Sequence, residues 1–138
     1  QQMLLDRSPD VRNIAADCLT VVVRFQPVDT LVALERDLRQ LAESDGDVVA
    51  RHGGVLGLGA IVLAYPYSIP HSPVDMPAVL TRLAAAVAES DPIRTSTRKV
   101  FAEFWRTHQD GWGRHKESFT EDQLSILTEL LVSPLHYA

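Results

Sequence analysis

The chain has 138 residues, of which 46% are hydrophobic and 22% are charged, values that suit a single globular domain with its own core. Its formal charge of −5 argues against a direct nucleic-acid-binding surface, and no apolar run approaches the roughly 18 residues that cross a bilayer. The single cysteine, Cys18, excludes an internal disulfide, and its apolar neighbours in the sequence predict a core position.

Capping residues and apolar periodicity place the helices in order along the chain. Residues 1–6 are expected to end a preceding helix, and Ser8 with Pro9 is typical of the start of the next one. Asp91 and Pro92 repeat this device, and the segment that begins at Thr120 has the pattern of a capping box. The predicted helices cover residues 9–25, 28–43, 47–64, 74–89, 92–108 and 120–132.

Two connections between these helices are longer than the rest. Residues 66–73 contain three prolines and are expected to be extended. Residues 109–118 contain Trp112 between two glycines, and we expect Trp112 to pack against the last helix pair and to fix the direction in which the tail leaves. Pro134 is expected to end the last helix near Val132, which leaves residues 133–138 as a short extended tail.

A small acidic turn followed by an arginine occurs three times. The arginines are Arg12, Arg51 and Arg94, which lie 39 and 43 positions apart. Helical-hairpin repeats of the HEAT and armadillo type have periods of roughly 40–47 residues. The predicted fold is therefore all-α, a HEAT-like α-solenoid of antiparallel helix pairs over residues 1–132. Its upstream end should expose apolar side chains, for which the candidates are Met3, Leu4, Leu5 and Ile14.

The residues that could carry chemistry favour structural roles. The glycines between Gly53 and Gly59 lack the strand and the Gly-Lys-Ser/Thr sequence of a phosphate loop, so they predict close helix packing. His108, Asp110 and His115 could surround a metal in principle, but hydrogen bonding is the favoured role for the two histidines. Because no nucleophile, base and acid form a set, we expect no catalysis, no metal and no cofactor.

Four segments carry a resemblance to a known family. They are Tyr65-Pro66-Tyr67, RTHQDGW at residues 106–112, HKESFTEDQL at residues 115–124 and LLVSP at residues 130–134. Together they resemble the C-terminal region of the proteasome activator complex subunit 4 family, very large HEAT-repeat activators that work without ATP. The resemblance is strongest from Arg51 to Ala138.

The resemblance implies a dome-like solenoid that caps the α-ring of the core (20S) proteasome. It also implies a C-terminal hydrophobic–Tyr–any-residue tail that inserts between α-subunits, pairs its carboxylate with a lysine and promotes gate opening. By position this partner-binding tail is Leu135, His136, Tyr137 and Ala138, with Tyr137 as the motif tyrosine and Ala138 as the source of the carboxylate. His136 stands where the family prefers a hydrophobic or aromatic residue. The family is also linked to acetylated histones, to DNA repair, and to the nucleus and cytoplasm.

The alternative function is a general HEAT scaffold or adaptor that binds another protein on its concave face, and an enzyme comes third. Blocking the C-terminal carboxylate separates the first two functions, because a pure scaffold should not respond to it.

Overall fold

The computed structural model describes the backbone of residues 2–65 and 74–137, and the side chains in these ranges except those of Gln2, Glu129 and residues 131–137. Within these ranges the chain is helical and has no strand, so the predicted all-α class is confirmed. The α-helices are α1 (Pro9–Val22), α2 (Val28–Ala42), α3 (Val48–Ala64), α4 (Met76–Ala85), α5 (Ile93–His108), α6 (Trp112–His115) and α7 (Glu121–Tyr137). Short 3-10 helices are η1 (Gln2–Leu5), η2 (Val23–Phe25), η4 (Ala86–Ala88), η5 (Gln109–Gly111) and η6 (Lys116–Ser118).

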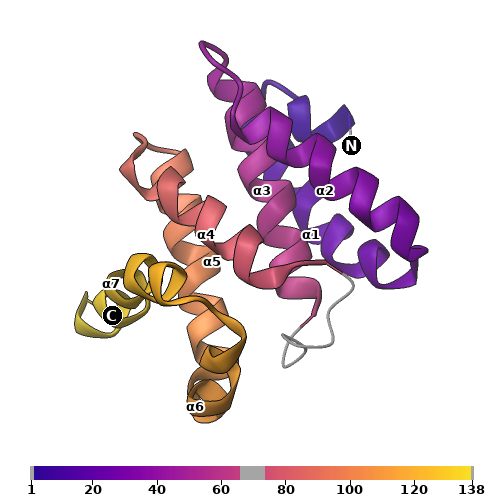
Figure 1. Ribbon diagram of the computed structural model, residues 1–138. Helices are drawn as coiled ribbons and strands as arrows, with labels where there is room; N and C mark the ends of the chain where they lie inside the picture. Colours follow the sequence, from indigo (N-terminus) through magenta and orange to yellow (C-terminus); the bar gives the residue numbers. More distant parts are fainter. Residues whose placement is uncertain (1, 66–73, 138) are drawn as a thin grey trace.

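The helices stack as consecutive pairs, as in a HEAT-like solenoid (Figure 1). The first complete pair is α2 with α3, and the next is α4, continued by η4, with α5. Along one side α1, α3 and α5 lie next to one another, and α7 packs against α4 and α5 at the far end. The predicted proline-rich connection, residues 66–73, lies outside the described residues. Among the described residues we find no helix with both the length and the apolar character that crossing a membrane requires.

Helix α3 is the centre of the fold. It contacts η1, α1, α2, α4 and α5, and every residue from His52 to Val62 is buried. A helix that is apolar on all sides must be enclosed by protein, and small residues let its neighbours come close. The core is completed by side chains from the helices around it, including Leu31, Leu38, Leu80 and Phe101.

The glycines of α3 are positions where another segment touches the helix backbone. A Cβ atom at Gly54 would collide with the backbone nitrogen of Ala42 and would lie 2.7 Å from the carbonyl oxygen of Leu38, both in α2. A Cβ at Gly59 would lie 2.7 Å from Cγ2 of Val100 in α5. The prediction that these glycines serve close helix packing is therefore confirmed.

The N-terminal end exposes apolar surface, as the sequence predicts, but two single-residue predictions are wrong. Met3 and Ile14 are exposed by 58% and 60%, and Leu5 is also exposed. Leu4 is instead buried, because its backbone rests against α3 at Gly53, where there is no Cβ. Cys18 is exposed rather than in the core, since the helical period carries it away from the buried face of α1.

The end of the last helix also differs from the prediction. The sequence predicts a helix that stops near Val132 and an extended tail from residue 133, whereas α7 continues to Tyr137. Proline removes one backbone hydrogen bond, but its φ of about −65° is compatible with a helix, so the backbone continues through Pro134. The connection after α5 also contains the short helix α6, which the sequence prediction did not include.

Candidate functional site: the C-terminal helix and its supports

Three of the four predicted partner-binding residues lie at the end of α7. The backbones of Leu135, His136 and Tyr137 belong to its last turn. Their side chains, and all of Ala138, lie outside the described residues. The described part of the chain therefore defines how the helix that carries them is held.

The start of α7 is fixed by a reciprocal pair of hydrogen bonds. The backbone N–H of Gln123 donates to Oγ1 of Thr120 over 3.1 Å, and the backbone N–H of Thr120 donates to Oε1 of Gln123 over 2.9 Å. This is the predicted capping box, which satisfies backbone donors that have no partner inside the helix. Glu121 and Asp122 lie in the first turn, where negative charge is favourable.

Apolar contacts hold α7 against the second pair of helices. Leu127 is completely buried, and Leu124 and Leu130 pack partly against the same core. The partners of α7 are α4 and α5. The helix that carries the predicted tail is thus packed along its first three turns on the end of the solenoid.

A cluster of rings, here called the aromatic joint, connects α5 to the start of α7. Its members are Phe104, Trp105, His108, Trp112, His115 and Phe119. The half-buried ring of Trp112 lies at its centre, 5.4 Å from the ring of Phe119 and 6.0 Å from that of Phe104 between centroids. Trp112 therefore packs between α5 and the residue that precedes α7, in agreement with the predicted packing, while its role in fixing the direction of the tail stays a prediction.

The aromatic joint contains two buried imidazoles. Nδ1 of His108 donates to the carbonyl oxygen of Phe104 over 2.9 Å, and its ring stacks on that of Phe104. The ring of His115 meets that of His108 edge-on at 5.2 Å, and Nδ1 of His115 is buried without a hydrogen-bond partner. Burial lowers the pKa of His108, the hydrogen bond to Phe104 opposes this shift, and the nearby His115 adds to it. Burial also lowers the pKa of His115, and the charge of Arg114 lowers it further.

In the part of the chain that it describes, the structure offers no set of three ligands for the metal site considered at His108, Asp110 and His115. His108 and His115 are brought together, but the described residues contain no group of three histidine, cysteine or acidic side chains placed to hold an ion. The hydrogen bond and the ring contacts agree with the favoured structural role of these histidines.

A buried polar chain links three repeats, and the sequence analysis did not predict it. Nε of Arg12 donates to Nδ1 of His52 over 3.1 Å, and Nε2 of His52 lies 2.9 Å from Oγ of Ser96. Nη1 of Arg12 also donates to the carbonyl oxygens of Asp6 and Arg7, in the turn before α1. The only sign of it in the sequence was the repeat of about 40 residues, which indicated that similar turns recur but not that side chains of successive repeats touch.

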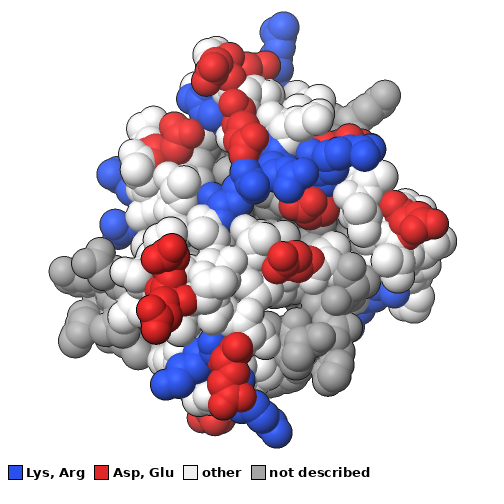
Figure 2. All heavy atoms as spheres, in the orientation of Figure 1, with Lys and Arg blue, Asp and Glu red and all other residues white. Residues whose placement is uncertain are grey.

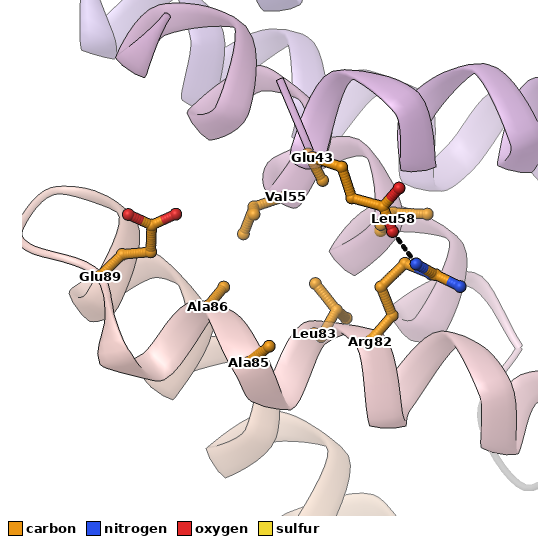
Figure 3. A pocket seen from close by; sticks show the side chains of 9 residues that line it. Glu43, Val55, Leu58, Arg82, Leu83, Ala85, Ala86 and Glu89 are labelled. Atoms are coloured by element: carbon orange, nitrogen blue, oxygen red, sulfur yellow. Dashed lines mark hydrogen bonds and ion pairs between the residues drawn. The ribbon is translucent and has the colours of Figure 1, made fainter. Parts of the chain in front are cut away.

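A pocket of about 210 Å³ lies between the end of α2 and the α4–η4 segment, with Val55 and Leu58 of α3 as its floor (Figure 3). Glu43 contacts Arg82 across one end. At the other end Nε of Arg51 lies 3.1 Å from Oε2 of Glu89, an ion pair whose geometry is not that of a hydrogen bond. Figure 2 shows acidic and basic side chains interspersed over this junction of α2 and α4.

Comparison with known proteins gives a consistent result over the whole chain. Residues 48–138 match the family model described as "Proteasome activator complex subunit 4-like, C-terminal". The chain is 49% identical to human proteasome activator complex subunit 4 over an alignment of 154 positions, gaps included, which covers 99% of this chain and 8% of the relative. It is 36% identical to proteasome activator complex subunit 4A of Danio rerio, with the same two coverages. It is 34% identical to proteasome activator subunit 4 of Arabidopsis thaliana, over 100% of this chain and 8% of the relative. The chain thus spans less than a tenth of the length of these curated relatives.

Proposed function

This chain belongs to the proteasome activator complex subunit 4 family, whose C-terminal region it matches, and we propose that it docks the activator on the α-ring of the core proteasome and helps to open the gate. The observation that carries the proposal is the family match over residues 48–138, in a chain that folds as a helical solenoid. The relatives are named as activators, which supports a role in regulating the proteasome rather than in catalysis.

In this proposal Leu135, His136, Tyr137 and Ala138 enter a pocket between two α-subunits. Tyr137 supplies a flat apolar ring with a phenolic hydrogen bond, and Ala138 supplies a carboxylate for a charge-assisted bond to a lysine. A tail shifts a gate only if it binds the open arrangement better than the closed one. Contacts that form only in the open arrangement therefore matter more than total binding strength.

The helical form of the last turn adds a step to this proposal. A four-residue segment reaches roughly 13 Å when extended but only about 6 Å as a helix. The last carbonyl groups of a helix have no partner within it, and Pro134 contributes no backbone N–H. We therefore expect the turn after Pro134 to unwind on docking, while the capped and packed part of α7 stays in place.

The test is peptide hydrolysis by the core proteasome, without ATP, in the presence of the full-length activator. Deleting Tyr137 and Ala138 should lower the stimulation at least about tenfold, because a charge-assisted bond and an aromatic contact are lost together. Ala138→Ser keeps the carboxylate and is the matched control, which should behave as the unaltered protein does. Complex formation is measured in parallel, so that loss of gate opening is distinguished from loss of binding.

Unchanged stimulation after the deletion would contradict the proposed role of the tail and would favour the scaffold alternative. Membership of the family extends the proposal to acetylated histones as cargo, to DNA repair, and to action in the nucleus and cytoplasm. Comparing the binding of acetylated and unmodified histone peptides to the full-length protein tests the cargo, and equal binding would contradict it.

A further inference from the structure

The contact between the α2–α3 pair and the α4–α5 pair is built differently on its two sides. On the α3–α5 side the helices touch closely, since Val100 fills the space over Gly59. A hydrogen-bond distance of 2.9 Å joins His52 Nε2 to Ser96 Oγ on the same side. Close apolar contact and a buried polar contact together make this side resistant to separation.

On the α2–α4 side the two helices are separated by the pocket of about 210 Å³ (Figure 3). Small residues line part of it, with Ala42 at the end of α2 and with Ala85 and Ala86 in the α4–η4 segment. Short side chains leave the gap unfilled, so dispersion contacts between α2 and α4 are lost there. The distance between α2 and α4 can therefore change while α4 stays packed on α3.

Two ion pairs border the gap, Glu43 with Arg82 of α4 at one end and Arg51 of α3 with Glu89 at the other. Glu43 and Arg82 have exposed side-chain fractions of 56% and 34%, and Arg51 and Glu89 have 20% and 35%. Ion pairs in contact with water are weak and are screened by salt. Arg51 also donates to the carbonyl oxygen of Ser44 over 3.1 Å, so its pair ties the turn after α2 to the end of η4.

We propose that this junction is a hinge, with α3, on which both α4 and α5 rest, as its axis and the two ion pairs as latches that close the gap between α2 and α4. When the latches open, α4, α5 and α7 turn together relative to α1, α2 and α3. The latches thereby set the angle between the upstream repeats and the C-terminal helix. This inference does not rest on the docking role of the tail, because it concerns only how adjacent repeats are joined.

Hydrogen exchange in the full-length protein, without the proteasome, tests the hinge. Glu43→Gln combined with Glu89→Gln removes both latches while keeping the side-chain shapes. Exchange should rise at least about threefold in the last turn of α2 and in α4–η4. Exchange around Val100 in α5, at the axis, should stay unchanged. Ala86→Leu fills the gap and should slow exchange in the same two segments.

Arg94→Gln is the matched control, because Arg94 pairs with Asp91 within a single turn and not across the gap. It should leave exchange in α2 and α4 unchanged. Raising the salt concentration from about 0.05 to 0.5 M shortens the Debye length, so in the unaltered protein it should raise exchange as the double substitution does. In the double variant the same change in salt should have no further effect on exchange. Equal exchange in all proteins, or a rise around Val100 as large as in α4, would overturn the hinge.

Discussion

Arg12 donates a hydrogen bond to His52 although 40 positions separate them in the chain, and both side chains are buried. Because Nδ1 of His52 accepts this bond, its proton must be on Nε2, which then donates to Ser96. An imidazolium could not accept from Arg12 and would face a guanidinium charge. A neutral imidazole is therefore required to connect the three repeats.

The first prediction concerns acid stability. Burial and the charge of Arg12 lower the pKa of His52 from 6.5 to about 4. A histidine with a lowered pKa contributes stability that is fully present above the unfolded value and is lost as pH falls through the window from 6.5 to 4. The loss from His52 should reach about 3 kcal/mol near pH 4, measured by urea unfolding at a series of pH values.

The His52→Gln variant isolates this contribution. It should be less stable at neutral pH, and its stability should fall less between pH 7 and 4 than that of the unaltered protein. Some acid sensitivity should remain, because burial also lowers the pKa of His108 and His115. Parallel stability curves for the two proteins would show that His52 does not titrate as described.

A second prediction uses two glycines in different surroundings. Gly54→Ala places a Cβ against the backbone of α2, which cannot rotate away as a side chain can. The free energy of unfolding should therefore fall by about 2–3 kcal/mol. Gly113→Ala is the control, since a Cβ there meets nothing within 4 Å, and it should be neutral or stabilise by up to about 1 kcal/mol. If both substitutions had the same effect, helix propensity rather than close packing would explain the glycine.

The third prediction concerns the aromatic joint. Trp112→Ala removes a half-buried ring that contacts Phe104 and Phe119, so it should lower the free energy of unfolding by about 2–3 kcal/mol. Exchange of backbone amides in the first turns of α7 should rise at the same time. Trp112→Phe keeps an aromatic ring and should cause less than half of both effects. Protection of α7 that is unaltered in Trp112→Ala would show that the joint does not hold this helix.

A fourth prediction follows from the proposed docking of the tail. His136→Phe places an apolar ring where the resemblance favours one, so a peptide ending in this sequence should bind the core proteasome more tightly than the natural one. The gain should be about 1 kcal/mol, which a competition assay with labelled peptide can measure. His136→Ala is the companion variant and should bind more weakly than both. Equal affinities for all three peptides would remove the role of this position in docking.

The helices were predictable because the signals for them are local. Thr120 and Gln123 are neighbours in sequence, and their capping box follows from their spacing alone. The close packing at Gly54 was predictable in kind, but its partner Leu38 was not, because the partner depends on how two helices stack. Cys18 shows the limit of reading neighbours, since its apolar neighbours in sequence lie on other faces of α1.

The contacts that join successive repeats are distant in sequence and were not predicted. Nothing around Arg12 indicates that it reaches His52, because the approach is created by stacking one repeat on the next. Trp112 was predictable as a packing residue because it is a large ring in a connection rich in small and polar residues. The assignment of Leu135, His136, Tyr137 and Ala138 came from the resemblance, and it remains a prediction.

The enclosure of α3 has a mechanical consequence. In a solenoid whose repeats touch only their neighbours, a stretching force can detach one repeat at a time. Here six segments rest on α3, some before it in the chain and some after it: η1, α1, η2, α2, α4 and α5. Pulling on the two ends of the chain should therefore leave this block intact until α3 yields, and its helices should then come apart in one large extension step.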